Sequence, residues 1–262
     1  MHMATHKLIS WNVNGIRAAE KKGLIDWIGQ SGANVIALQE TKAHPDQLSA
    51  ELRAPHNYHS HWCAAEKKGY SGVATYTRTA PHTVTLGLGD PRFDADGRVL
   101  VTKLPHYTFF NIYFPNGGRG PEWVAHKLAF YDHFLTIVQE LMAAGESVIV
   151  AGDVNTAYAP IDIARPRENA RVSGFMPEER AAMGRFFEAG LIDTFRHVYP
   201  EEVKYSWWAA WGGAREKNVG WRLDYMLVSP DLRPYIVDAD IHCDTLGSDH
   251  CPVSLTLELP EK

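Results

Sequence analysis

The stretch LGSDHCPVSLTLEL, residues 246–259, carries two signals that bear on how this chain is built. From Val253 to Leu259 apolar and polar residues alternate, which is the period-two pattern of a β-strand with one buried face. Directly before this strand stand an acid and an imidazole, Asp249 and His250. A polar pair at a strand edge is often only a solvated turn. A functional role for Asp249 and His250 becomes more plausible if other strands also end in polar side chains and the fold brings these side chains together.

Short β-type runs recur along the chain, too many for a helical protein. The runs are KLISWNV near 7–13, NVIALQE at 34–40, GVATYTR at 72–78, RVLVTKL at 98–104, YTFFNIYFP at 107–115, SVIVAGDVN at 147–155, DYMLVS at 224–229 and PVSLTLEL at 252–259.

Helical patterns lie between some of these runs. The clearest covers 122–143, where apolar residues recur every three or four positions before Gly145. A weaker helix is predicted over 19–30, and another after PEER at 177–180. Many close strands with few long helices favour an α/β layered sandwich, with two mixed sheets packed face to face and helices on the outer faces. No linker or repeat divides the sequence, so we predict a single domain over 1–262.

Composition excludes several classes of protein. The 262 residues are 45% hydrophobic and 22% charged, which excludes disordered and collagen-like chains. A net charge of -5 argues against coating nucleic acid by charge alone. No apolar run reaches the ~18 residues of a membrane span, and no signal peptide is evident, so we expect a cytoplasmic monomer with no membrane contact. Three cysteines without CxxC spacing indicate neither a disulfide framework nor a structural zinc site.

Carboxylates, amides and a histidine stand at many of the predicted strand ends, where functional sites are commonly built. This set is rich in oxygen ligands and has no cysteine, so it suits Mg²⁺, or Mn²⁺, better than zinc. Each member by itself has an ordinary explanation as a loop residue, and their convergence is the hypothesis. The set comprises Asn12, Asn14, Glu40, Tyr113, Asn116, Asp153, Asn155, Asp224, Asp249 and His250.

Common catalytic motifs are absent: there is no GxxxxGK[ST], GxGxxG or HExxH, and GYSGV at 69–73 misses the GxSxG nucleophile motif by one position. Aromatic residues gather instead in the glycine-containing segment 205–225, beside cations. Such a segment can stack on bases or sugars. We assign Trp207 and Trp221 to binding, and Trp208 and Trp211 to the core.

Eight motifs in order resemble the exonuclease III and AP endonuclease family of DNA-repair enzymes. They are SWNVNGIRA, LQETK, GYSGV, NIYFPNGGRG, GDVNTAY, GFMPEER, NVGWRLDY and GSDHCP, and they span about residues 7–259. The resemblance implies a four-layered α/β sandwich of the endonuclease, exonuclease and phosphatase superfamily, with Asp249 and His250 in the active site.

The resemblance also implies a metal site. Glu40 corresponds to the principal Mg²⁺ ligand, with Asp249 and Asn14 near alternative metal positions and Asn12 hydrogen-bonding within the site. Some members of the family have Asp at the position of Asn14, so its amide makes a second metal doubtful, and we expect one Mg²⁺.

Catalytic roles carry over in the same way. Asp153 corresponds to the residue that deprotonates or orients the attacking water, and Asn155 to the one that aligns this water with the scissile phosphate. Asp224 and His250 correspond to an Asp-His pair, in which the carboxylate favours the protonated imidazole as a donor to a phosphoryl oxygen. The alternative assignment makes His250 the base, and the sequence leaves both open.

The remaining matches concern DNA, and each could also be explained by loop or core packing. Tyr113, Asn116 and Asn169 match phosphate-contacting positions, and the Tyr113 hydroxyl could polarise the transition state. Other matches are Trp207, Trp221 and Leu223 in the pocket for a base-less sugar, Tyr70 and Arg98 in duplex-contacting loops, and Arg119 in a segment that enters DNA near the lesion.

Together these matches imply a Mg²⁺-dependent AP endonuclease that cuts 5′ to abasic sites in double-stranded DNA, with some 3′ to 5′ exonuclease or 3′-repair phosphodiesterase activity on 3′-blocked ends. Two alternatives stay open: a phosphoesterase of the same fold that acts on small phosphoesters, and a catalytically silent DNA-binding protein. The sequence leaves the balance of endonuclease and exonuclease activity, incision at uridine or oxidised bases, and protein partners undetermined.

Overall fold

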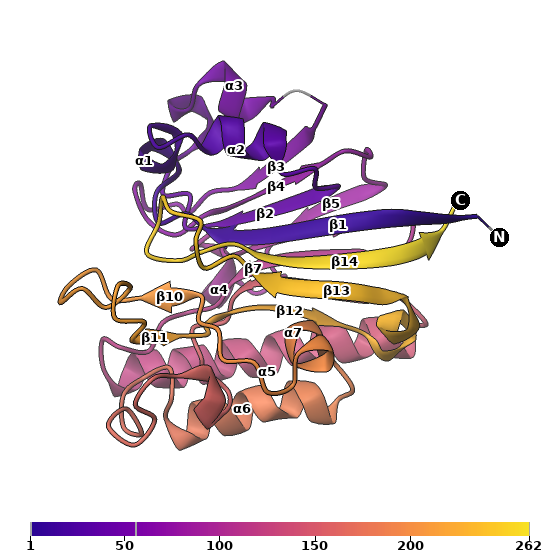
Figure 1. Cartoon of the computed structure of the whole chain (residues 1–262). Helices are drawn as coiled ribbons and strands as arrows, with labels where there is room; N and C mark the ends of the chain where they lie inside the picture. Colours follow the sequence, from indigo (N-terminus) through magenta and orange to yellow (C-terminus); the bar gives the residue numbers. More distant parts are fainter. Residues whose placement is uncertain (1, 56, 262) are drawn as a thin grey trace.

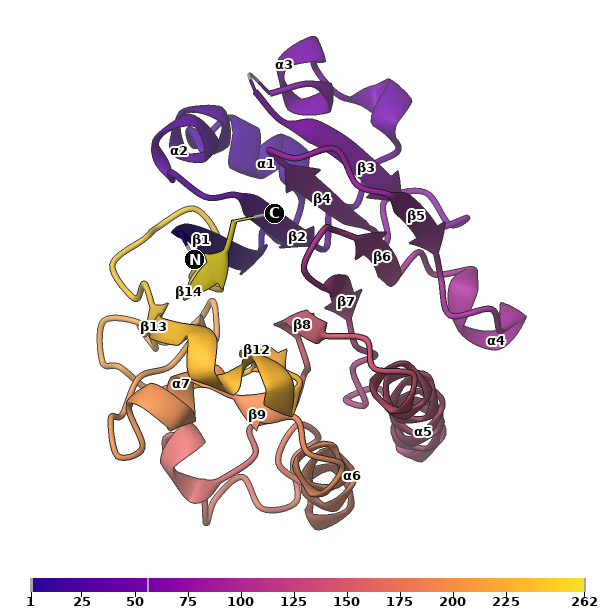
Figure 2. The ribbon, with the colours of Figure 1, turned by 90° about the vertical axis from the view of Figure 1, so that its right-hand side faces the viewer.

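Two six-stranded sheets face each other in the computed structural model, which describes residues 2–55 and 57–261. Helices cover the outer faces of both sheets, so the predicted four-layered α/β sandwich is confirmed (Figures 1 and 2). The two termini lie at one end of the sandwich, and the short β10–β11 ribbon lies at the other (Figure 1).

The first sheet has the order β13-β14-β1-β2-β4-β3. Only β1 and β2 pair in parallel, and the other neighbours are antiparallel. Its strands are β1 (Met3–Asn12), β2 (Val35–Gln39), β3 (His59–Cys63), β4 (Val73–Thr77), β13 (Ile236–Ile241) and β14 (Val253–Pro260).

The second sheet has the order β5-β6-β7-β8-β12-β9, with β7 and β8 in parallel. A separate ribbon pairs β10 (Trp207–Trp208) with β11 (Gly220–Trp221). The strands of the second sheet are β5 (Thr83–Leu86), β6 (Val99–Lys103), β7 (Thr108–Tyr113), β8 (Val148–Asp153), β9 (Ile192–Asp193) and β12 (Asp224–Val228).

Helices α1 to α3 cover the first sheet, and the long α5 lies beside α6 over the second (Figures 1 and 2). Among the described residues, no helix is long and apolar enough to cross a membrane. The α-helices are α1 (Ile16–Glu20), α2 (Leu24–Gln30), α3 (Ala50–Arg53), α4 (Pro91–Asp94), α5 (Pro121–Ala143), α6 (Pro177–Glu188) and α7 (Thr194–Val198), and the 3₁₀ turns are η1 (Pro45–Gln47), η2 (Pro160–Asp162) and η3 (Pro230–Tyr235).

Two predictions of local structure need correction. The helix expected over 19–30 is two short helices, α1 and α2, because Gly23 between them has a φ of 94°. Strand β3 was not predicted because its sequence HSHWC is polar, β5 because its four residues TVTL are mostly exposed, and β13 because two aspartates interrupt its apolar residues. Strands β9 to β11 have only two residues each, too few for a periodic signal.

The core lies between the two sheets and is built by alternation along each strand. Leu8, Phe109, Ile149 and Met226 belong to one buried cluster, which comes from the inner faces of both sheets. Further clusters join α5 and α6 to the second sheet and α1 to α3 to the first. Burying these faces removes apolar surface from water, which is the main force that holds the layers together.

The inner face changes from apolar to polar toward the end that carries the β10–β11 ribbon. There Asn111 of β7 donates from Nδ2 to the Ala74 carbonyl at 2.7 Å and to Thr75 Oγ1 at 3.1 Å. Gln39 Nε2 donates to Asn111 Oδ1 at 2.8 Å and to Ser10 Oγ at 3.0 Å. These bonds tie the two sheets together directly beside the strand ends.

Replacing Asn111 with alanine should lower the free energy of unfolding by about 2–4 kcal/mol, because the substitution leaves buried polar groups without partners and opens a cavity. Urea unfolding followed by circular dichroism measures this loss. Gln30→Ala, at an exposed position on α2, is the control and should stay within about 0.5 kcal/mol of wild type. Equal stability of both variants would show that the bridge between the sheets adds nothing.

Candidate active site

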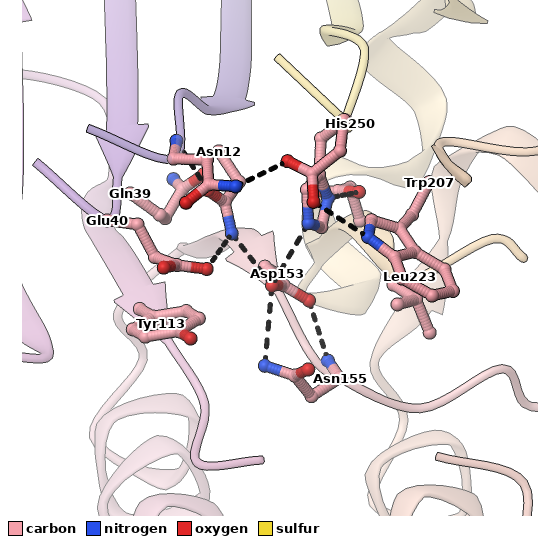
Figure 3. Close-up of polar contacts among 12 residues, drawn as sticks. Asn12, Gln39, Glu40, Tyr113, Asp153, Asn155, Trp207, Leu223 and His250 are labelled. Atoms are coloured by element: carbon pink, nitrogen blue, oxygen red, sulfur yellow. Dashed lines mark hydrogen bonds and ion pairs between the residues drawn. The ribbon is translucent and has the colours of Figure 1, made fainter. Parts of the chain in front are cut away.

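Strand register aligns the polar side chains predicted to carry chemistry. Asp153 is paired with Tyr113 across β7 and β8, and with Asp224 across β8 and β12, so these three residues form one row in the second sheet. In the first sheet Asn12 is paired with Gln39. The same alternation that buries Ile149 and Ala151 turns Asp153 toward the inner face. Figure 3 shows Asn12 of the first sheet and Asp153 of the second pointing toward each other.

Asp153 is the centre of the site and is buried. Its Oδ2 accepts from Asn12 Nδ2 at 3.0 Å, and its Oδ1 accepts from the backbone N–H of Asn155 at 2.8 Å (Figure 3). Burial raises the pKa of Asp153 to about 7, helped by the nearby Asp224 and Glu40 carboxylates and opposed by His250. The carboxyl group therefore gains and loses its proton near neutral pH, which suits a general base.

His250 lies between two carboxylates. Its Nδ1 is 2.8 Å from Asp224 Oδ2, and its Nε2 is 3.8 Å from Asp153 Oδ2. Burial by itself would lower the pKa of His250, but Asp224 and Asp153 outweigh it and raise the pKa to about 10. The imidazole is therefore protonated near neutral pH and can donate a hydrogen bond from Nε2.

Glu40 follows β2 and faces Asp153. Its Oε1 accepts from Asn12 Nδ2 at 2.9 Å, and its Oε2 is 2.8 Å from Lys42 Nζ. Burial opposes ionisation of Glu40, but Lys42 and Asn12 outweigh it and lower the pKa. Glu40 is thus a stable carboxylate at the rim of the site.

One group of three acid or imidazole side chains among the described residues could hold a metal ion: Glu40, Asp153 and His250, with ligand atoms within 4.8 Å of one another. This donor set differs from the expected one, because Asp249 is absent from it. Asp249 Oδ1 accepts from Asn14 Nδ2 at 2.9 Å, and its Oδ2 accepts from Trp207 Nε1 at 3.2 Å. The two carboxylates fit a hard divalent cation, and Asp249 with Asn14 forms a separate hydrogen-bonded pair at the rim.

A cavity of about 310 Å³ opens in front of these groups. Trp207 and Trp221 pack edge to face on one side, with ring centroids 6.1 Å apart, and Leu223 lies beside them in the same apolar cluster. The cavity is lined by Asn14, Glu40, Tyr113, Asn116, Asp153, Asn155, Val172, Ser173, Gly174, Trp207, Trp221, Leu223, Asp249 and His250. Asn12 and Asp224 are buried behind this lining, where they hold Asp153 and His250.

Four predicted DNA contacts lie outside the lining of the cavity. Asn169 donates to the Ala164 and Arg165 carbonyls within its own loop. Arg119 lies over the Tyr70 ring at 5.7 Å. Arg98 departs from the expectation of a contact residue, because it is only 3% exposed and donates to Tyr70 Oη at 2.8 Å. Its guanidinium is paired with Asp96 and holds the Tyr70 hydroxyl in place through this hydrogen bond.

The prediction for Trp211 also needs correction. It was assigned to the core, but it is 75% exposed, in the loop between β10 and β11. The loop residues have no strand pairing that would turn this indole inward. Trp208 is buried as predicted, and Arg215 stacks on its ring at 4.6 Å.

Sequence reasoning missed two residues that organise the site. Lys42, inside the quoted motif LQETK, pairs with Glu40 and also donates to Asn14 Oδ1. Lys42 stands two residues after Glu40 in the sequence, and this spacing could have indicated that the two side chains pair. Ser206 Oγ accepts from the backbone N–H groups of Leu223 and Asp224, both at 3.0 Å. Nothing in a lone serine of segment 205–225 pointed to this role.

Comparison with known proteins gives one family match and many relatives. The model of the endonuclease/exonuclease/phosphatase family matches residues 9–250. An exodeoxyribonuclease of Bacillus subtilis (strain 168) is 42% identical over 97% of this chain and 100% of its own length. The DNA repair nuclease APEX1 of Danio rerio is 38% identical over 97% of this chain and 83% of its own length.

Comparison with solved structures finds proteins of the same kind. An AP endonuclease from Leishmania major superposes with a TM-score of 0.86 at 29% identity, covering 98% of this chain and 88% of the other. The two-sheet architecture is therefore shared along almost the entire length of both chains.

Asp224→Asn should lower the pKa of His250 well below 10, because the variant lacks the carboxylate that contributes most to holding the imidazole in its protonated form. NMR titration of the His250 ring in metal-free protein measures the pKa. Asp238→Asn, on β13, is the control and should leave the titration unchanged. If His250 titrated identically in the wild type and in Asp224→Asn, the electrostatic origin assigned to its charge would be wrong.

Proposed function

The chain belongs to the exonuclease III and AP endonuclease group of the endonuclease/exonuclease/phosphatase family, and we propose that it is a Mg²⁺-dependent DNA-repair phosphodiesterase that cuts 5′ to abasic sites in duplex DNA. As a hydrolytic nuclease of the exonuclease III type, it would also remove nucleotides or blocking groups from 3′ ends. The observation that carries the proposal is the placement of Asp153 and His250 at one cavity edged by two tryptophans. We further predict a cytoplasmic monomer.

Asp153 is the better candidate for the base. With a pKa of about 7 it is partly ionised near neutral pH, whereas His250, with a pKa of about 10, already holds its proton. Asp153 would take a proton from a water molecule that attacks the phosphorus. Asn155 Nδ2 is 3.3 Å from Asp153 Oδ2, so this amide is placed to align the same water and the scissile phosphate.

His250 and Tyr113 would act as donors. His250 lines the cavity with its Nε2 3.8 Å from Asp153 Oδ2, and its Nε2–H can bind a phosphoryl oxygen as negative charge develops. Burial raises the pKa of Tyr113 well above its usual value, and Glu40 and Asp153 add to this effect. The phenol therefore keeps its proton and is a second donor at the same row of the sheet.

Mg²⁺ would be held by the Glu40 carboxylate, beside Asp153 and His250, and when bound it would supply Lewis-acid stabilisation of the phosphate and the leaving 3′ oxygen. Oxygen ligands favour Mg²⁺, with Mn²⁺ as a substitute. The Lys42 ammonium on Glu40 Oε2 would limit the free negative charge that a cation meets there.

Selectivity for the lesion would come from the size and character of the cavity. Trp207, Trp221 and Leu223 form an apolar edge that fits a sugar without a base better than a full nucleotide. Turning an abasic sugar out of a duplex costs less than turning out a paired base. The enzyme can thus select damage without reading sequence.

Duplex contacts would come from the rim of the cavity. Asn116 lines it and donates from Nδ2 to Asn155 Oδ1 at 3.0 Å, so a phosphate bound there would lie beside the catalytic amide. Tyr70, Arg119 and Asn169 belong to loops outside the lining and would contact DNA farther from the cut. Trp211, exposed in the loop between β10 and β11, would add an aromatic surface for DNA.

Cleavage of a labelled duplex with one abasic-site analogue tests this function. Mg²⁺ should support incision 5′ of the lesion, EDTA should abolish it, and Glu40→Ala, Asp153→Asn and His250→Ala should each lower kcat at least ~10²-fold because each removes a group that acts on the transition state. Circular dichroism checks that the variants fold.

Asp132→Asn is the matched control, since this exposed acid pairs with Arg185 on the helical surface. It should cut at the wild-type rate. Attack only at the 3′ ends of both the lesion and the undamaged duplex would make the protein chiefly an exonuclease. Hydrolysis confined to a panel of small phosphomonoesters would replace the DNA-repair assignment with the alternative phosphoesterase function.

Trp221→Ala should weaken discrimination between an abasic and an intact duplex by roughly tenfold or more, because the enlarged cavity holds the bare sugar less tightly and excludes a nucleotide less well. The ratio of kcat/KM for the two duplexes reports this. Leu86→Ala, an exposed apolar residue on edge strand β5, is the control. An unchanged ratio in Trp221→Ala would remove this indole from lesion recognition.

A further inference from the structure

A fully buried ion pair lies behind the site and has no part in the mechanism described above. Lys127 of α5 and Glu179 of α6 are both 0% exposed, and Lys127 Nζ is 2.8 Å from Glu179 Oε1. Removing two charges from water is costly, and apolar side chains of similar volume often stabilise a fold as well or better. The pair therefore calls for an explanation other than stability.

Lys127 makes a second bond, and this one reaches the catalytic segment. Its Nζ donates to the backbone carbonyl of Asn155 at 2.6 Å. One helical turn further along α5, Tyr131 Oη donates to the Val154 carbonyl at 2.5 Å. The inner face of α5 thus binds the two carbonyls that directly follow Asp153.

The anchored residue has a restricted backbone. Asn155 has a φ of 55°, a left-handed conformation that is uncommon for residues other than glycine. In this conformation its N–H donates to Asp153 Oδ1, and its Nδ2 donates to the Phe114 carbonyl at 2.9 Å. A bond to its carbonyl oxygen therefore helps to fix both the amide and the carboxylate that handle the attacking water.

Glu179 uses the rest of its carboxylate on the loop that lies beside Asn155. Its Oε1 accepts from Ser173 Oγ at 2.8 Å, and its Oε2 accepts from the backbone N–H groups of Gly174 at 2.5 Å and Met176 at 3.2 Å. Ser173 and Gly174 line the cavity, and with Val172 they form what we term the pocket wall, residues 172–174. One buried acid thus holds both the wall and the lysine.

We propose that Lys127 and Glu179 are positioning residues that lock the catalytic Asn155 to the pocket wall, so that Lys127 sets the rate of the chemical step and Glu179 sets discrimination for the lesion. This inference rests on the proposed nuclease function. A misplacement of about 1 Å at a reacting group can cost ~10²-fold in rate, so a distant bond to one carbonyl is enough to matter.

Three variants separate positioning from stability. Lys127→Met leaves the Glu179 charge buried without its ammonium partner and should unfold more easily. Lys127→Met with Glu179→Gln removes both charges, while the glutamine Oε1 can still accept from Gly174 and Met176. Lys127→Met with Glu179→Leu also removes the acceptor for the pocket wall. Lys103→Met, which breaks the more exposed pair with Glu146, is the matched control.

The Met–Gln double variant should recover stability in urea unfolding relative to Lys127→Met, but its kcat on the abasic duplex should stay 10- to 100-fold below wild type. Its Kd for that duplex in EDTA and its ratio of kcat/KM between abasic and intact duplex should change less than about threefold. The Met–Leu variant should in addition lose about tenfold of this discrimination. The Lys103→Met control should match wild type in every readout.

Other outcomes overturn the proposal. Recovery of kcat together with stability in the Met–Gln variant, or failure of that variant to fold, would make the pair purely structural. If the wild type itself does not cut abasic duplexes, the nuclease assignment fails, and amide hydrogen exchange then decides about positioning. Exchange at 153–156 should be faster in the Met–Gln variant than in wild type, and equal exchange would reject the inference.

Discussion

The buried carboxylate of Asp153 is the constraint around which this molecule is arranged. It lies where the inner faces of the two sheets meet, accepts from Asn12 of the first sheet and from Asn155 after β8, and has His250 on its other side. A carboxylate removed from water needs such partners, because an unpaired buried charge is strongly unfavourable. The packing of the sheets and the chemistry of the site thus depend on the same few bonds.

Burial and neighbouring charges give Asp153 and His250 different protonation states near neutral pH. Asp153 and Asp224 are neighbours on adjacent strands, so the Asp224 carboxylate adds to burial in raising the pKa of Asp153. The imidazolium of His250 between them relieves the repulsion, which explains a base that titrates near neutral pH beside a histidine that keeps its proton. The same low-dielectric surroundings would strengthen each donor aimed at a phosphate.

The helices of the outer layer over the second sheet also make hydrogen bonds to the chain around the site. Helix α5 packs apolar side chains on the second sheet, yet on the same inner face it presents Lys127 and Tyr131 to the chain that follows Asp153. Helix α6 presents Glu179 to the neighbouring loop, where it accepts from Ser173, Gly174 and Met176. Hydrophobic packing sets where the helices lie, and a few buried polar bonds transmit that placement to the catalytic loop.

Much of this protein follows from the sequence by itself. Short β-type runs predicted eight of its strands, periodicity of three to four residues predicted α5, and ordered motifs such as GDVN and GSDH indicated the family and the candidate residues of the site. The sequence could not show that the imidazole lies between Asp153 and Asp224, that Asp249 pairs with Asn14, that Arg98 is buried or that Trp211 is exposed. Those facts depend on sheet register and loop paths, because residues more than a hundred positions apart, such as Asn12 and Asp153, meet only when two sheets close on each other. Ionisation likewise depends on burial and neighbouring charge, and only the tertiary structure brings these together.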